Sequence, residues 1–272
     1  MCIVMYGKDV AEELYDATIK TDKKLVILVG EDDKASKVYA NTLSKLGASM
    51  NIPVATTIIP RGFATHNVID YLHIFNVQDS VGSIMLMLPL YKHLHERLIC
   101  DLIKTNKDID CVGAEAQGYG YTNYGDMPCT PEACLRILEH YGIEIEGKKA
   151  VVIGRSNLVG RPVAELLLRK NATVTICHSK TKDLKAELLQ ADIIISAVGK
   201  PHFITPDMVK DGVVIVDVGI SFKDGKICGD VDPSVESKAY AYTPVPNGVG
   251  VVSNALLLYR HSVRNGVGVW KL

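Results

Sequence analysis

Residues 147–162 constrain the fold most, because their pattern predicts a strand, a glycine turn and a helix in direct succession. Residues 150–153 form a short apolar run rich in β-branched side chains, typical of a buried parallel strand. The run ends at Gly154, and a helical pattern begins at Pro162, whose missing N–H costs nothing in a first turn. The N-terminus of such a helix favours an anion, usually a phosphate. The spacing is G-x-S-x-x-x-G rather than G-x-G-x-x-G, and a strand–glycine–helix unit can also serve packing alone.

Residues 172–177 predict a second strand, which ends at His178, Ser179 and Lys180. In dinucleotide-binding folds the tip of the second strand meets the adenosine ribose, and an acidic residue there selects NAD. This tip has no acid, whereas Ser179, Lys180 and Arg155 of the turn could together hold a 2′-phosphate. The sequence therefore predicts NADP as the cofactor, with NAD as the alternative. In the competing interpretation, Ser179 and Lys180 form only a solvated loop.

The composition excludes several classes of protein. The chain has 272 residues, of which 47% are hydrophobic and 22% charged, as in ordinary globular proteins. Its 30 basic and 31 acidic residues create no bulk field for nucleic acid or an anionic membrane, so we expect neither partner. No apolar run is long enough to span a bilayer, and the first ten residues lack the pattern of a signal peptide.

The seven cysteines are an odd number and include no C-x-x-C pair, which argues against a disulfide scaffold or a zinc site. His93, His95 and Cys100 fall in a predicted amphipathic helix among ordinary polar neighbours, so we do not interpret them as metal ligands. We expect no metal. A reducing cytoplasm fits this cysteine usage best.

Alternating strands and helices predict a parallel α/β architecture throughout the chain. In the first part, strands are expected at residues 25–29, 54–59, 81–88 and 109–112. A first helix is expected to start at Asp9, and three further helices are expected at residues 35–50, 68–75 and 93–105. Residues 118–128 are turn-rich and predict a boundary loop, and Thr130 then caps a helix that runs to about Tyr141.

In the second part, strands are expected at residues 193–198 and 213–218, a loop at 243–250 and a last helix at 253–265. The two strands end at Gly199 and Gly219, and ligands of open parallel sheets bind beyond such carboxyl ends. We expect two α/β domains, the second a Rossmann-type doubly wound parallel sheet, with the active site in the cleft between them. The expected first domain is residues 1–120 plus 253–272, closed by the last helix, and the second is residues 121–252.

A series of short sequence blocks, spread over nearly the full length of the chain, resembles the motifs of one enzyme family. In order, the blocks are VGEDDKASKVYA, LPL, KDID, PCTP, VVIGRSNLVGRPVAELLL, CHSKTKDL, AVGKP, DVGI, GDV and TPVPNGVG. They are similar to the family of bifunctional methylenetetrahydrofolate dehydrogenase/methenyltetrahydrofolate cyclohydrolase. The resemblance implies a folate cleft between the domains, a tetrahydrofolate derivative as substrate and usually a homodimer. It also implies a set of NADP-binding residues: Thr130, Gly154, Arg155, Ser156, Val159, Gly160, Ser179, Gly199 and Ile220.

Two further residues are implied to contact the folate. In the family the tyrosine corresponding to Tyr39 packs along the folate, and the aspartate corresponding to Asp110 holds the exocyclic amine and a ring nitrogen of the pterin. A carboxylate suits that task, because it accepts two parallel hydrogen bonds. Without the resemblance, Tyr39 could be a packed helix aromatic and Asp110 a loop cap. Both stand in family register, which favours the functional interpretation.

The chain departs from the family where protons are handled. The family carries a lysine four residues after the tyrosine, the general acid/base of the cyclohydrolase step, and a glutamine that hydrogen-bonds this lysine. Here these positions are Leu43 and Met87. Replacing both partners of a buried polar pair can be nearly neutral for stability. Lys45 does not replace the lysine, since on a helix it lies about 200° around from position 43.

Other folate-side positions have also changed, whereas the cofactor half is nearly unaltered. The family's Asp-Gly pair is Asp110-Cys111, Leu-Pro-Leu-Pro ends in Tyr91, and the loop Pro-Gly-Gly-Val-Gly-Pro-Met-Thr has become residues 246–253. Asn247 in this loop adds bulk where backbone approaches ligand.

The sequence thus predicts an NADP-dependent methylenetetrahydrofolate dehydrogenase with weak or absent cyclohydrolase activity. One alternative is an oxidoreductase that keeps the cofactor half and acts on another, more apolar substrate. Another is a non-catalytic relative that binds NADP or folate as a sensor or partner subunit.

Overall fold

The computed structural model describes residues 2–223 and 225–266, and internal contacts divide the chain into two compact units. Unit 1 combines the residues up to Glu13 with Cys129–Ser253. Unit 2 combines Leu14–Pro128 with the residues from Asn254 onward. Two helices, α1 (Lys8–Asp16) and α9 (Val249–Asn265), each contribute residues to both units.

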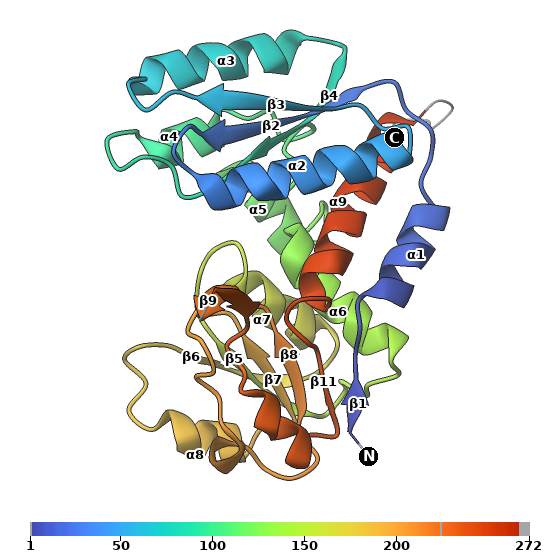
Figure 1. Ribbon diagram of the computed structural model, residues 1–272, viewed down its shortest axis with the longest axis vertical. Coiled ribbons are helices and arrows are strands. Elements are labelled where there is room, and N and C mark those ends of the chain that lie inside the picture. Colours follow the sequence, from blue (N-terminus) through green and yellow to red (C-terminus); the bar gives the residue numbers. More distant parts are fainter. Residues whose placement is uncertain (1, 224, 267–272) are drawn as a thin grey trace. The chain divides into compact units, whose positions relative to one another are not determined.

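Unit 1 is built on a six-stranded sheet in the order β1-β11-β8-β7-β5-β6, in which every pairing is parallel (Figure 1). The chain runs from β5 outward to β6 and then returns across β5 to β7, so strand order reverses beside β5, as in doubly wound folds. The strands are β1 (Ile3–Val4), β5 (Lys149–Ile153), β6 (Thr173–Cys177), β7 (Ile193–Ser196), β8 (Val214–Asp217) and β11 (Ala241–Tyr242).

The central strands of unit 1 form because they are apolar on both faces. β7 and β8 are buried along their whole length, and β5 is exposed only at Lys149. β6, at the sheet edge, leaves Thr173, Thr175 and Ile176 exposed. The remaining elements are α6 (Cys129–His140), α7 (Gly160–Arg169), α8 (Leu184–Leu189), the 3₁₀ helices Pro206–Met208 and Pro233–Ser237, and the hairpin of β9 (Ser221–Lys223) and β10 (Lys226–Cys228).

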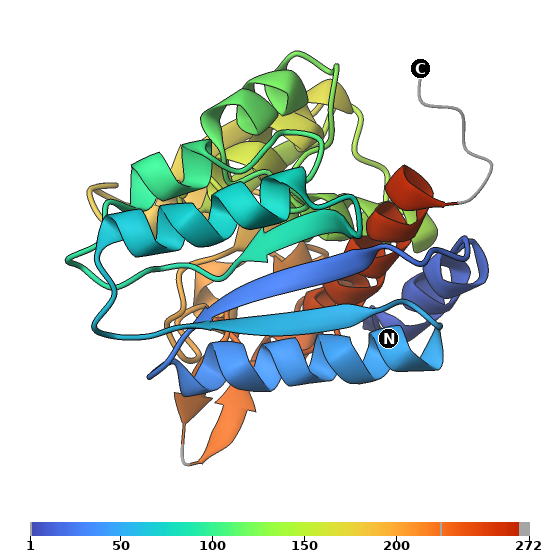
Figure 2. The same cartoon turned by 90° about the horizontal axis from the view of Figure 1, so that it is seen from above.

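Unit 2 contains a three-stranded parallel sheet in the order β3-β2-β4. Helices α2 and α3 cover its two faces (Figures 1 and 2), as right-handed crossovers in opposite directions require. The Asp33 carboxylate caps α2 by accepting the N–H of Ser36 at 2.9 Å. The elements are β2 (Lys24–Gly30), β3 (Val54–Ile59), β4 (Val81–Leu86), α2 (Lys34–Ser49), α3 (Thr65–Val77), α4 (Glu96–Asp101) and α5 (Ala114–Tyr121).

A buried histidine attaches α9 to the sheet of unit 2. His261 is fully buried; its Nδ1 lies 2.9 Å from Ser83 Oγ, and its Nε2 lies 3.0 Å from the carbonyl oxygen of Lys23. Burial lowers its pKa to about 4, so the imidazole is neutral at physiological pH. The helix is therefore held at β4 and at the entrance to β2.

The expected α/β class with a doubly wound parallel sheet is confirmed, but four local predictions are wrong. Residues 109–112 form no strand, because the Asp108 carboxylate accepts the N–H groups of Val112 and Gly113 and curls the chain after a single bridge to Ile84. The helix expected at 93–105 is only α4, residues 118–121 of the expected loop belong to α5, and α9 starts inside the loop expected at 243–250.

The boundaries of the two units also differ from the expected domains. The backbone N–H of Ile3 bonds to the carbonyl of Tyr240, and β1 pairs with β11, so the start of the chain belongs to unit 1. On the other side, unit 1 resumes at Cys129 rather than at residue 121. Within residues 2–223 and 225–266, no helix combines the length and apolar character needed to cross a bilayer.

Replacing either of two helical glycines of unit 2 by alanine should change the stability of the protein, in opposite directions. A Cβ at Gly47 would lie 2.5 Å from Val54 Cγ2 and 2.9 Å from the backbone oxygen of Ile52, whereas a Cβ at Gly118 would meet nothing within 4 Å. Alanine gains about 1 kcal/mol of helix propensity over glycine, and overpacking costs about 1–3 kcal/mol. We expect Gly118→Ala to raise the urea midpoint of unfolding and Gly47→Ala to lower it. Shifts in the same direction would contradict the packing argument.

Candidate active site

A glycine turn joins β5 to α7 at the carboxyl edge of the unit 1 sheet. Gly154 has φ +120°, and a Cβ there would lie 2.7 Å from the carbonyl oxygen of Ala197. A Cβ at Gly160, the first residue of α7, would collide with the carbonyl of Gly154. Only glycine allows this close approach of strand end and helix start. The two positions therefore form a cradle, with a helix N-terminus beside it, that fits a dinucleotide phosphate.

Ser156 organises this turn from within. Its Oγ accepts the backbone N–H groups of Val159 and Gly160 at 3.2 and 3.3 Å. Its carbonyl accepts the N–H of Arg161 at 3.1 Å. The hydroxyl thus shapes the entrance to α7. The side chains of Arg155 and Ser156 are exposed at the open side of the turn.

The tip of β6 lies beside this turn, because Ile153 and Cys177 are paired residues of β5 and β6. Arg155 and Ser179 each follow their strand by two residues and are exposed. The tip is ordered by its own hydrogen bonds, since the N–H of His178 bonds to Thr181 Oγ1 at 2.9 Å. Lys180 is also exposed, so two cations and a hydroxyl stand on neighbouring loops.

The opposite end of the expected cofactor site lies beyond β7 and β8. Gly199 has φ +66°, and its Cβ position is 4.0 Å from the carbonyl oxygen of Ile220, so the structure brings these two predicted residues together. The side chain of Ile220 is 65% exposed, which leaves it available for an apolar contact. Thr130, in the first turn of α6, has its hydroxyl 3.1 Å from that of Ser253.

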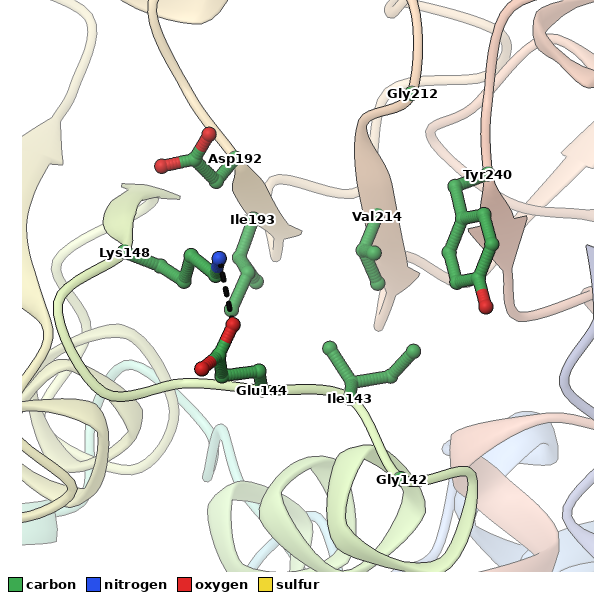
Figure 3. A pocket seen from close by; sticks show the side chains of 9 residues that line it. All are labelled: Gly142, Ile143, Glu144, Lys148, Asp192, Ile193, Gly212, Val214 and Tyr240. Atoms are coloured by element: carbon green, nitrogen blue, oxygen red, sulfur yellow. Dashed lines mark ion pairs between the residues drawn. The ribbon is translucent and has the colours of Figure 1, made fainter.

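A hollow of about 300 Å³ lies at the other edge of the same sheet. Its lining includes Ile193 and Val214, at the amino ends of β7 and β8, and the ion pair of Lys148 and Glu144 at 2.8 Å (Figure 3). It is therefore remote from the glycine turn. Ligands of doubly wound sheets bind at the carboxyl edge, so we do not assign the cofactor to this hollow.

In unit 2, the positions that should handle protons are apolar and packed. Tyr39 is half-buried on α2, and Leu43, one turn further along, is 0% exposed. Met87 is half-buried just after β4, where its N–H bonds to the carbonyl of Leu28 at 3.0 Å. Lys45 is exposed, on the side of α2 away from Leu43. The position where the resemblance implies the family lysine is thus occupied by a buried leucine.

Two arginines of α9 hold the loop that carries Asp110. Arg260 Nη1 donates to the carbonyl of Ile109 at 3.1 Å, and Arg264 Nη1 donates to that of Asp108 at 2.9 Å. Both guanidinium groups also face Asp126, at 3.5 and 2.5 Å. Although burial raises the pKa of Asp126, the two arginines outweigh it and lower that pKa below its usual value. The carbonyls just before Asp110 are thus fixed by charged donors.

Asp108 supports the same loop from the other side. It is 1% exposed, and its two oxygens accept the N–H groups of Val112 and Gly113 at 3.1 and 2.8 Å. Burial raises its pKa to about 6, with a smaller contribution from the charge of Asp110. Asp110 itself is half-buried and stands on this clamped turn.

Two residues at positions where the family resemblance implies glycine have the backbone conformation that glycine favours. Cys111 has φ +54° and Asn247 has φ +83°, in the left-handed region. The Cys111 thiol is buried and donates to the carbonyl of Asp126 at 3.2 Å, and burial raises its pKa to about 12. The thiol is therefore an inert packing group, and the loop conformation survives the substitution.

Tyr91, in the position of a family proline, closes the carboxyl end of β2. Its hydroxyl accepts the N–H of Asp32 at 3.1 Å, and its ring stacks on His93 with 5.6 Å between centroids. A Cβ at Gly30 would lie 3.5 Å from the Tyr91 ring. The substitution thus places an aromatic side chain over the turn that leads into α2.

Sequence reasoning missed the supporting residues of both regions. For the loop that carries Asp110, the sequence offered one hint of supporting residues. Arg260 and Arg264 are four residues apart and so lie on one face of the last helix. The buried Asp108, Asp217 and Asp230 fall in the family-like blocks KDID, DVGI and GDV, but no supporting role could be inferred for them, because an isolated aspartate at a strand end also suits an ordinary turn. Among the residues that the structure describes, no three His, Cys, Asp or Glu side chains are grouped so as to hold a metal ion.

A doubly wound parallel sheet with a glycine cradle and a helix N-terminus at its switch point defines a dinucleotide-binding domain of Rossmann type. Comparison with known families agrees. Residues 128–264 match the NAD(P)-binding domain of tetrahydrofolate dehydrogenase/cyclohydrolase, and residues 5–110 match its catalytic domain. The chain belongs to the tetrahydrofolate dehydrogenase/cyclohydrolase family, and the expected resemblance is confirmed.

Individual relatives extend this result over more than nine-tenths of the chain. The bifunctional protein FolD of Clostridium botulinum is 44% identical over 253 residues, which cover 92% of this chain and 89% of the relative. The crystal structure of FolD from Campylobacter jejuni has a TM-score of 0.92 at 36% identity and covers 97% and 99% of the two chains. The Trypanosoma brucei enzyme, complexed with NADP cofactor and inhibitor, has a TM-score of 0.88 at 29% identity, covering 96% of each chain.

Proposed function

We propose that this protein is an NADP-dependent methylenetetrahydrofolate dehydrogenase whose methenyltetrahydrofolate cyclohydrolase activity is weak or absent. Family membership supports the folate substrate and the nicotinamide cofactor. The proposed weakness or absence of cyclohydrolase activity rests on the full burial of Leu43, one helical turn from Tyr39, together with Met87 at the end of β4.

Oxidation of the one-carbon bridge requires that the substrate and the cofactor be oriented toward each other, and it depends less on acid/base groups. Bound NADP would supply the hydride acceptor. The glycine cradle and Ser156 would hold its diphosphate, Arg155 would reach its 2′-phosphate, and the Asp110 carboxylate would accept two hydrogen bonds from the pterin. Because Asp110 stands on a loop clamped by Arg260 and Arg264, its carboxylate is preorganised for that task.

Hydrolysis of the methenyl product has a different requirement. Water must be activated and a ring nitrogen protonated, and a positioned acid/base group accelerates such steps by about 10²–10⁴-fold. Leu43 and Met87 carry no titratable proton. Lys45 is exposed while Leu43 is buried, so its ammonium group is on the wrong side of α2. The proposed site thus retains positioning and lacks proton transfer.

We expect the purified protein to reduce NADP with methylenetetrahydrofolate, while methenyltetrahydrofolate decays no faster with protein than in buffer alone. Absorbance assays measure both rates. The variant Leu43→Lys with Met87→Gln restores an acid/base pair and should accelerate hydrolysis by at least about tenfold. The matched control, Leu43→Met with Met87→Gln, conserves volume without an ammonium group and should hydrolyse nothing.

Fast hydrolysis by the unaltered protein would overturn the proposed loss. Binding of NADP without binding of a folate analogue would instead favour an oxidoreductase with a different substrate. Binding of both without any turnover would favour a non-catalytic relative.

We propose NADP over NAD because Arg155, Ser179 and Lys180 stand on neighbouring loops with no acidic residue at the β6 tip. The double variant Arg155→Ala with Lys180→Ala removes two cations from the proposed 2′-phosphate site. It should lower kcat/KM for NADP by about tenfold or more and leave that for NAD nearly unchanged. Lys182→Ala, an exposed lysine of the same loop, is the control. An equal loss for both cofactors would contradict the assignment.

We also propose that the protein is a cytoplasmic homodimer. Its described cysteines are all free thiols, which fits a reducing compartment. β6 is an edge strand with Ile176 40% exposed, and an unpaired edge is a template for a second copy of the chain. Light scattering should give about twice the 29.7 kDa of one chain, and a monomer mass would exclude the dimer.

A further inference from the structure

A pair of buried carboxylates lies at the carboxyl ends of β7 and β8. Asp217 is 3% exposed and Asp230 is 0% exposed. Asp217 is the last residue of β8 and pairs with Ser196, the last residue of β7. Asp230 joins the two strand ends, because its Oδ2 accepts the hydroxyl of Ser196 at 2.8 Å and its own N–H donates to Asp217 Oδ1 at 3.1 Å.

Each carboxylate holds the backbone of the adjoining loops. Asp230 accepts the N–H groups of Val198 and Lys200 at 2.9 and 2.7 Å, and these two residues flank Gly199. Asp217 accepts the N–H of Gly219 at 2.9 Å, directly before Ile220. The same side chain accepts the N–H of Val231 at 2.9 Å. The two residues predicted to meet the cofactor at this end, Gly199 and Ile220, are thus both anchored by this pair.

Glycines permit this arrangement. A Cβ at Gly219 would collide with the carboxylate of Asp230, and a Cβ at Gly229 would collide with that of Asp217. The carboxylates therefore lie directly against loop backbone, with no side chain between them and the strand-end loops. Across the described ranges, the donors that meet these two carboxylates are backbone N–H groups and the Ser196 hydroxyl, with no lysine or arginine side chain among them.

By the rule for doubly wound sheets, the nicotinamide end of a bound dinucleotide would fall at these loops. The glycine turn after β5 would receive the phosphates, and the tip of β6 would receive the adenosine. Sheet order continues in the opposite direction through β7 to β8, so the other end of a dinucleotide falls beyond those strands. The oxidised nicotinamide ring carries a positive charge that the reduced ring lacks, and buried charges act over several ångströms where water is excluded.

We propose that Asp217 and Asp230 are positioning residues that hold the nicotinamide-side loops and, through their buried negative charge, favour binding of the oxidised over the reduced cofactor. The inference rests on the proposed dehydrogenase function only in requiring that the protein bind the dinucleotide. A purely structural role would weaken both redox forms of the cofactor equally. A charge effect changes their relative affinity.

The test is to measure the dissociation constants of NADP and NADPH by calorimetry for the unaltered full-length protein and for Asp230→Asn. We expect the preference for NADP over NADPH to fall about tenfold in the variant. Asp232→Asn makes the same charge change two residues away, at an aspartate that caps Ser234 outside the pair, and should leave the preference unchanged. Asp217→Asn removes one charge from the same pair. It is the substitute if Asp230→Asn fails to fold, and it should lower the preference for NADP over NADPH in the same way.

Equal weakening of both forms, in whichever of the two variants is folded by circular dichroism, would overturn the charge effect. The same change in Asp232→Asn would also overturn it, because general surface charge would then explain the result. Failure of the unaltered protein to bind either form would instead refute the proposed function. The two failures are therefore distinguishable.

Discussion

Backbone N–H groups beyond the strand ends must find acceptors, and in this protein buried aspartates supply them. Asp108 forms a bridge to Ile84 of β4, Asp217 ends β8, and Asp230 joins the ends of β7 and β8. Each accepts at least two N–H groups from loops expected to meet a ligand. An unpaired buried amide costs about 1–3 kcal/mol, so these carboxylates decide which loop conformations are available. The loops of the proposed cofactor site and those of the proposed folate site are both held by such buried aspartates.

The two halves have nevertheless changed in different ways. At the cofactor half, the cradle of Gly154 and Gly160 keeps the close backbone approach that a phosphate site needs. At the folate half, Cys111 and Asn247 hold positive φ at positions where the family resemblance implies glycine. Leu43 and Met87 stand where the family resemblance implies a polar pair, and replacing both members of such a pair can be nearly neutral for stability. On the proposed function, the chain would lack the proton-transfer chemistry and keep the framework.

The fold could be predicted where strands are buried on both faces. β2, β5, β7 and β8 are continuous apolar or β-branched runs, and their positions were found within a few residues. β3, an edge strand that is partly exposed, was found from its β-branched run. β1 and β11 were missed, because two residues carry no periodicity. The glycines of α5 predicted a loop, but Gly120 serves close packing: a Cβ there would lie 2.7 Å from the carbonyl of Asp126. The Asp108 turn overrode a strand-like run for a similar tertiary reason, and the aspartates that organise the loops became recognisable only with their partners in place.

The pairing of β1 with β11 has a consequence for the order in which the protein can form. Ile3 and Ala241 are partners in neighbouring strands, although almost the entire chain separates them. A ribosome releases the first of these residues long before it makes the second. The amino-terminal segment must therefore remain without its partner until residue 241 has been made, while the β2–β4 sheet, whose strands all precede residue 87, has its complete sequence much earlier. The dinucleotide-binding sheet can acquire its β1 edge only after that point.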